Sequence, residues 1–153
     1  MTREGGEPSL VCRVRDLRCA IPLEHVEETM RPLAVEPLAG VPAFIRGLAI
    51  VRGSPIPVVD AAALIYGDTA EPTRFITLKV GARRIALAVD AVIGITAMAP
   101  DDYRALPSLF ENAGLSAIAA IGVMDAELLL VLRATRLVPD DVWTAGQLPV
   151  ADA

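Results

Sequence analysis

The sequence predicts an all-β fold with short helices, built from two similar small β-units. Three observations support this fold class: apolar residues alternate with period two across short turns, helical stretches are brief, and one strand pattern occurs twice along the chain. Small closed barrels are the expected form of such units, because closure removes exposed sheet edges.

Four hairpins carry the strand pattern. In one of them Ile76 and Leu78 alternate with their neighbours, and the return strand follows a turn that contains Gly81. The predicted hairpins are residues 10–23 turning at Asp16, residues 50–59 with Gly53 and Ser54 at the turn, residues 75–89, and residues 117–132. Pro55 and Pro57 predict an edge strand or a bulge, because proline cannot donate to a sheet ladder.

Two short helical stretches are predicted. Residues 23–28 give one or two turns after a strand. Residues 61–66 follow Asp60, a residue type that caps helix N-termini by accepting a backbone N–H bond, and Gly67 ends this second helix.

The two halves of the chain resemble each other. Residues 18–26 resemble residues 84–92, which lie 66 positions later, and residues 57–65 resemble residues 130–138, which lie 73 positions later. Both matches occur in the same order at similar offsets, which favours two similar β-units. Pro72 marks the break between the halves.

Length and charge limit the possible functions. A chain of 153 residues with 54% apolar residues suits one domain with a buried core, and its net charge of −5 argues against a nucleic-acid partner. No apolar stretch has the roughly 20 residues of a membrane span, and the polar start has no signal-peptide core. We expect a cytoplasmic protein without membrane insertion, with a flexible N-terminus at 1–8, one domain at 9–138 and a C-terminal tail at 139–153.

The sequence shows no catalytic set. The single histidine, His25, lies among glutamates, which is typical of a solvated helix face. No serine lies in a nucleophile elbow, and no glycine-rich phosphate loop occurs. Cys12 and Cys19 have no further ligands for a metal, and buried free thiols are favoured over a disulfide in a reducing cytosol. We expect no enzymatic activity, no cofactor and no metal.

Arg52 stands directly before Gly53 in an otherwise apolar hairpin. It is either a surface arginine beside a turn or a guanidinium displayed for a protein partner, since arginine is frequent at interface hot spots. The pattern alone leaves both interpretations open.

The central segment closely resembles the signature of CheW-like domains. That family shows Pro-x-Phe-[Ile/Val]-x-Gly, then Asn-Leu-Arg-Gly, then a strand ending in Pro-[Ile/Val]-Val-Asp; the corresponding residues here are PAFIRG at 42–47, IVRG at 50–53 and PVVD at 57–60. Residues 19–28 are similar to the family's strand-to-helix segment, and residues 86–92 to its Gly-x-x-Val-Asp-x-Val segment. The resemblance covers nearly the whole chain, from Ser9 to Val138.

The resemblance implies two SH3-like β-barrels packed over a shared apolar core, with the two subdomains split and recombined near residues 70–75. It also implies an adaptor, or scaffold, that couples the cytoplasmic tip of a chemoreceptor to the regulatory domain of a CheA-type histidine kinase. A groove between the barrels would take the apolar side of a receptor hairpin. The partner-binding residues implied are Arg52, Gly53, Val26, Glu28, Ile45, Arg46 and Val51.

The chain departs from the family pattern at three positions. Ile50 replaces the asparagine of Asn-Leu-Arg-Gly and could enlarge an apolar contact, Ala86 replaces a glycine, and Arg133 is the second-half counterpart of Asp60. The alternative function is a CheW-like module that binds a small molecule or a dedicated partner in a non-motility signalling pathway.

Overall fold

The computed structural model describes residues 6–69, 71–98, 103–104, 118–124 and 127–138. The strands are β1 (Glu7–Val14), β2 (Leu17–Pro22), β3 (Val26–Met30), β4 (Ile45–Val51), β5 (Ser54–Asp60), β6 (Arg74–Val80), β7 (Arg83–Val89), β8 (Ala91–Met98), β9 (Tyr103–Arg104), β10 (Ile118–Met124) and β11 (Glu127–Leu132). One α-helix, α1 (Ala61–Tyr66), and two 3-10 turns, Leu23–His25 and Ala134–Arg136, complete the described elements. The predicted all-β class with short helices is confirmed.

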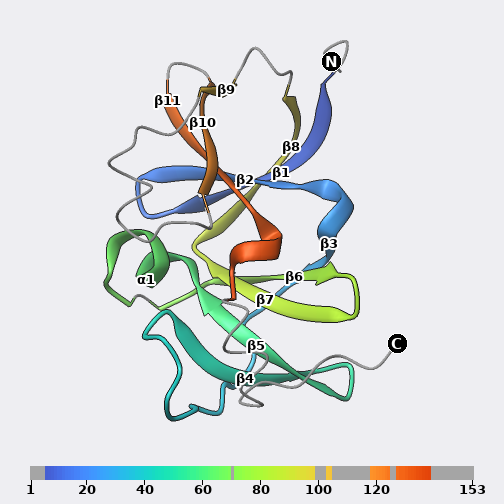
Figure 1. The fold of residues 1–153 in the computed structure, drawn as a ribbon, viewed down its shortest axis with the longest axis vertical. Helices are drawn as coiled ribbons and strands as arrows, with labels where there is room; N and C mark the ends of the chain where they lie inside the picture. The colour runs from blue at the N-terminus through green and yellow to red at the C-terminus, as the bar shows by residue number, and fades with distance from the viewer. Residues whose placement is uncertain (1–5, 70, 99–102, 105–117, 125–126, 139–153) are drawn as a thin grey trace.

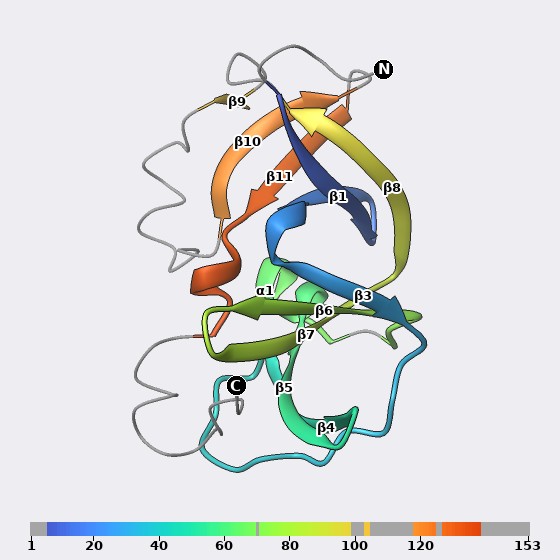
Figure 2. The ribbon, with the colours of Figure 1, turned by 90° about the vertical axis from the view of Figure 1, so that its right-hand side faces the viewer.

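The strands form two sheets, which lie one above the other in Figure 1. Sheet A has the strand order β8-β1-β2-β11-β10-β9, and sheet B has the order β3-β6-β7-β5-β4. The strands are strongly bent, as β8 and β10 show in Figure 2. The two predicted β-units are therefore present as two small packed sheets, whose hydrogen-bonded orders stay open among the described residues.

The two halves of the chain exchange strands. Strands β1 and β2 of the first half join β8, β10 and β11 of the second, whereas β6 and β7 join β3, β4 and β5. Each sheet contains one equivalent parallel pair: Ala20 lies opposite Val131 in sheet A, and Ala86 lies opposite Val58 in sheet B. These pairs reproduce the offsets of 66 and 73 between the halves, which confirms the internal repeat.

The second repeat begins with β6 at Arg74, and the chain crosses between the sheets at Leu23–His25 and again at Asp90. Strand β1 begins at Glu7, so it includes two residues that were expected in the flexible N-terminus. The expected tail at 139–153 lies outside the described residues.

The main core lies between the sheets and is built from strands of both. In β6, Ile76 and Leu78 belong to this core, whereas Phe75 belongs to a second core inside sheet B. Successive residues of a strand point to opposite faces, so both faces of β6 are covered. The second core consists of Ala49, Val51, Ile56, Val58, Phe75, Ala86 and Ala88.

One local prediction is wrong. Residues 23–28 are not a helix: a 3-10 turn at Leu23–His25 leads directly into β3, whose exposure alternates with period two. The prediction for the prolines holds for the segment that carries them. Strand β5 lies between β7 and β4, but it pairs with β7 only at 58–60, so Pro55 and Pro57 stand where the strand is paired on one side alone.

Candidate functional site

The β4–β5 hairpin ends in a two-residue turn formed by Arg52 and Gly53. Val51 and Ser54 are the last pair before the turn, and φ is 50° at Arg52 and 82° at Gly53. Two positive φ values are typical of a type I′ turn, whose twist matches the strands it joins. The hairpin therefore turns at Arg52–Gly53 and not at Gly53–Ser54. Glycine adopts this conformation readily, whereas a left-handed arginine costs about 1–2 kcal/mol.

Glu28 approaches this turn from β3, the strand at the other edge of sheet B. A β-bulge at Glu27 separates the pair Val26–Leu78 from the pair Glu28–Thr77. The buried Thr77 hydroxyl accepts the Glu28 N–H at 3.2 Å and donates to the Glu28 carbonyl at 3.3 Å. Because a bulge changes which face the next side chains take, Val26 packs on the core between the sheets while Glu28 takes the other face.

Arg52 and Glu28 form a two-pronged ion pair. The Arg52 Nε donates to Glu28 Oε1 at 2.7 Å, and Nη2 donates to Oε2 at 2.8 Å. The pair connects the two edges of sheet B, because β3 and the β4–β5 hairpin stand at opposite ends of its strand order. The hydrogen bonds from Arg52 lower the pKa of Glu28, and the same contact raises the pKa of Arg52. Both groups therefore remain charged at neutral pH.

This ion pair is exposed, and β4 carries an exposed apolar residue two positions before Arg52 in the chain. The Arg52 side chain keeps 74% of its surface exposed and that of Glu28 keeps 31%. Ile50 is 62% exposed, because β4 turns Ala49 and Val51 inward and Ile50 outward. An exposed guanidinium suits contact with another protein, and an exposed isoleucine on the same hairpin offers apolar area.

The structure brings together three of the seven expected partner-binding residues. Arg52, Gly53 and Glu28 meet at the hairpin tip. Val26 begins the strand that carries Glu28, but it is half-buried and packs against the core between the sheets.

Two other expected surface residues are buried, so their assignment to the surface is wrong. Ile45 is 4% exposed and Val51 is 8% exposed. A bulge at Arg46 separates the pairs Ile45–Val59 and Gly47–Val58. It places Ile45 in the core between the sheets, whereas Val51, further along β4, belongs to the core inside sheet B.

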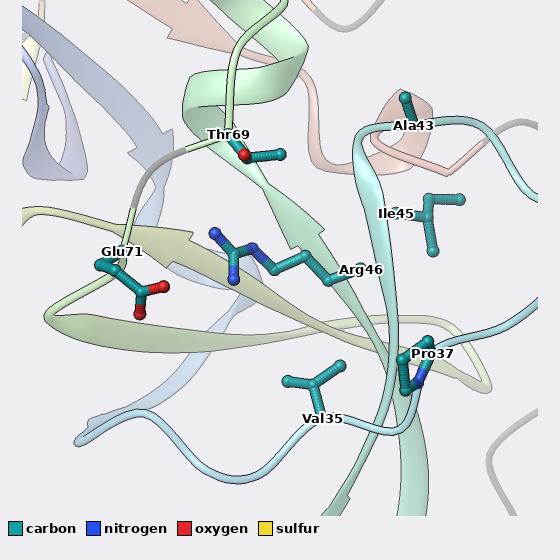
Figure 3. A pocket seen from close by; sticks show the side chains of 7 residues that line it. All are labelled: Val35, Pro37, Ala43, Ile45, Arg46, Thr69 and Glu71. Atoms are coloured by element: carbon teal, nitrogen blue, oxygen red, sulfur yellow. The ribbon is translucent and has the colours of Figure 1, made fainter.

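Arg46 belongs to a different site, at the other end of β4. Its Nε donates to the buried Asp60 Oδ2 at 2.8 Å, and Asp60 Oδ1 accepts the Ala63 N–H at 3.1 Å, which caps α1 as predicted. Figure 3 shows Arg46 extending into a hollow of about 530 Å³ between Val35 and the loop that carries Thr69 and Glu71. The contact with Asp60 gives Arg46 a structural role.

Gly47 is the glycine of the Pro-x-Phe-Ile-Arg-Gly segment, and the structure explains why no other residue fits there. Its φ is 141°, and a Cβ there would overlap the carbonyl of Glu36. Glu36 forms a bridge with Leu48, in which the two N–H···O distances are 2.8 and 2.9 Å. Only glycine allows the long segment before β4 to lie this close to the strand.

The sequence pattern of the CheW-like domain matches residues 8–142. The chain belongs to the CheW-like domain family. This CheW-like chain is 24% identical to the chemotaxis protein CheW of Rhizobium meliloti (strain 1021) over 140 residues, or 90% of each chain. It is 33% identical to protein FrzA of Myxococcus xanthus over 86 residues, or 54% of each chain.

A solved structure has the same fold. The scaffolding protein TtCheW from Thermoanaerobacter tengcongensis matches this CheW-like chain with a TM-score of 0.72 at 18% identity, over 86% of this chain and 92% of that one. At this identity the match shows the fold, which agrees with the two sheets described above.

The two cysteines and the single histidine of this CheW-like chain, its other chemically reactive side chains, do not belong to the hairpin tip. Cys12 and Cys19 face each other across β1 and β2 as buried free thiols, and the hydrogen bond between them, with burial, raises the pKa of Cys12. His25 lies 3.6 Å from the carboxylate of Glu24. Within the described residues no three metal-ligating side chains gather, and no helix is long and apolar enough to cross a membrane.

Proposed function

We propose that this protein is a non-enzymatic adaptor that couples the cytoplasmic tip of a chemoreceptor to the regulatory domain of a CheA-type histidine kinase. Membership of the CheW-like family and the relatives named chemotaxis protein CheW support the pathway. The structural observation that carries the proposal is the exposed Arg52–Glu28 pair at the hairpin tip.

The geometry of this pair suits a protein contact. The tight turn fixes the Arg52 backbone, and Glu28 holds the guanidinium, so little side-chain freedom remains to be lost on binding. Glu28 takes two of the N–H groups, and the guanidinium has others that can reach a partner's carboxylate or carbonyl. Ile50 adds apolar area that becomes buried on contact.

The receptor side of the proposal is tested with the cytoplasmic signalling fragments of the host's chemoreceptors. We expect Arg52→Glu to weaken the dissociation constant by about tenfold or more, because it reverses a central charge and opposes Glu28. Arg133→Glu, at an exposed site beyond β11, is the matched control and should leave binding unchanged. Equal binding by Arg52→Glu and the native protein would show that the ion pair is not part of the receptor interface.

The kinase side is tested by titration with the regulatory domains of the host's CheA-type kinases. Saturable one-to-one binding to one of them is expected. If none binds while a receptor fragment does, the protein is not a coupling adaptor.

A small-molecule function is the second candidate, and the hollow beside Arg46 favours it (Figure 3). It predicts a saturable small ligand whose binding is lost in Val35→Trp, which would fill the hollow. The adaptor is better supported, because the guanidinium of Arg46, which lines that hollow, is already bound to buried Asp60.

A further inference from the structure

Two buried thiols form a pair that the proposed adaptor function does not use. Cys12 on β1 stands directly opposite Cys19 on β2, and both residues are 0% exposed in the core between the sheets. The two thiols also hydrogen-bond each other. They are the two cysteines of the sequence, so a disulfide within the chain must join them.

The backbone geometry suits a bond between these thiols. Residues directly opposite each other on antiparallel strands have Cα atoms about 4.5–5.5 Å apart. Disulfides span Cα distances of about 4.4–6.8 Å, so β1 and β2 already have the required spacing. Opposite residues of a ladder share one face, so both sulfur atoms lie on the same side of sheet A. A disulfide therefore needs no change of register.

The hairpin that carries the two cysteines is held at its turn. Arg15 has a φ of 53°, and its N–H donates to Asp90 Oδ2 at 2.6 Å. Its guanidinium lies 4.7 Å from the centre of the Tyr66 ring. Within sheet A, β1 lies between β8 and β2, and β2 lies between β1 and β11. The register of Cys12 against Cys19 is therefore fixed, and further strands flank the pair on both sides.

Burial makes the pair slow to react in the folded protein. The hydrogen bond with Cys19, together with burial, raises the pKa of Cys12, so its thiol stays protonated at neutral pH. The thiolate is the form that attacks a disulfide, and an oxidant must also reach it. In the unfolded chain only residues 13–18 separate the two thiols, and loops of about ten residues close within about 0.1 μs. Thiol–disulfide exchange therefore belongs to the open hairpin.

We propose that Cys12 and Cys19 are a thiol–disulfide redox site, which is oxidised while β1 and β2 are apart and is then buried by folding. The oxidant is a low-molecular-weight disulfide such as oxidised glutathione. One cysteine thiolate attacks it, which forms a mixed disulfide and releases one small thiol. The second cysteine thiolate attacks the protein sulfur of the mixed disulfide and releases the other. Two cysteine thiols are oxidised, one small disulfide is reduced to two thiols, and these thiols take up the two protons that the cysteines lose.

The oxidised protein keeps the fold and resists unfolding. In a reducing compartment the pair stays as two thiols, whereas an oxidised thiol pool closes the bond during folding. The disulfide restricts the unfolded chain, which stabilises the folded state relative to the reduced protein. Once folded, the bond lies in the core between the sheets, where reductants reach it slowly.

The test refolds the reduced, urea-unfolded protein with an excess of oxidised glutathione and exposes the folded reduced protein to the same concentration. The refolded protein should have lost two hydrogens by mass spectrometry, carry no glutathione and give a native circular dichroism spectrum. It should also unfold at a higher urea concentration than the reduced protein. In the folded reduced protein, free thiols should disappear at least about tenfold more slowly than in the unfolded chain.

Cys19→Ala is the matched control, because its single cysteine can only keep a glutathione adduct or join a second chain, whether or not the variant folds. Adducts or linked dimers as the main products of the native protein would overturn the proposal, as would an oxidised chain without the native spectrum. Equal rates of thiol loss in the folded and unfolded protein would also overturn it, because folding would then give no protection. The test uses neither receptor nor kinase, so its outcome is independent of the adaptor function.

Discussion

At the scale of single residues, Arg52 combines an unfavourable backbone conformation with a favourable side-chain contact. A left-handed arginine is strained, yet in this conformation its guanidinium binds Glu28, which stands on the opposite edge of sheet B. The strain is therefore associated with a charged pair that joins the two edges of the sheet. This is a pattern expected at a functional position.

The Glu28–Arg52 pair makes the stability of the folded protein depend on pH in the acid range. Because the folded pKa of Glu28 is lowered from its usual 4.5, its contribution to stability is fully present above pH 4.5 and is lost as the pH falls through the lowered value. Glu28→Gln should melt slightly below the native protein at pH 7, and the two melting temperatures should converge in acid. Glu7→Gln, at an exposed carboxylate outside this pair, serves as the control. A constant difference from pH 7 to pH 3 would contradict the assignment.

Gly47 should tolerate substitution far less than other left-handed glycines. In Gly47→Ala the Cβ displaces the Glu36 carbonyl and breaks its bridge with Leu48, with an expected loss of roughly 3 kcal/mol or more in the free energy of unfolding. Gly81→Ala is the matched control: its φ is 62° and a Cβ there meets nothing, so a loss of about 1 kcal/mol is expected. Equal losses in urea unfolding would show that the close approach is unimportant.

At the scale of elements, regular strands could be predicted from the sequence and their irregularities could not. Period-two alternation located the hairpins, and Asp60 with Gly67 located α1. The bulge at Arg46 left no signal in that alternation, so Ile45 was assigned to the surface although it is buried. The exposed Ile50, by contrast, follows from the inward Ala49 and Val51 once the strand is placed.

Asp60 joins two elements, since one carboxylate oxygen caps α1 and the other binds Arg46 on β4. Asp60→Ala removes both contacts and leaves Arg46 without its buried partner, so a loss of roughly 3 kcal/mol or more in unfolding free energy is expected. Asp60→Asn can still cap the helix, so its free energy of unfolding should be about 1 kcal/mol higher than that of Asp60→Ala. Chemical unfolding of the two variants measures the difference. If Asn is as damaging as Ala, the cap contributes little.

At the scale of the whole molecule, the repeat was readable from sequence but the exchange of strands was not. The bulges also repeat: Ile93 of β8 lies 66 positions after Glu27, and Ala119 of β10 lies 73 positions after Arg46. The repeats differ where the proposed site lies. Gly94 stands 66 positions after Glu28, so sheet A cannot form the equivalent ion pair. The two sheets therefore share one design, and the pair formed by Glu28 and Arg52 belongs to sheet B.

The exchange predicts that neither half folds alone. Each sheet takes strands from both repeats, so a fragment of residues 1–70 or 71–153 cannot complete either sheet. Each fragment should lack a cooperative thermal transition by circular dichroism, and an equimolar mixture should regain one. Cys12 and Cys19, both in the first fragment, provide a second measurement, because they are buried between the sheets and the raised pKa of Cys12 keeps its thiol protonated. Alkylation at neutral pH should be fast in the isolated fragment and slow in the mixture; a cooperative transition and protected thiols in residues 1–70 alone would show that the first repeat is an independent unit.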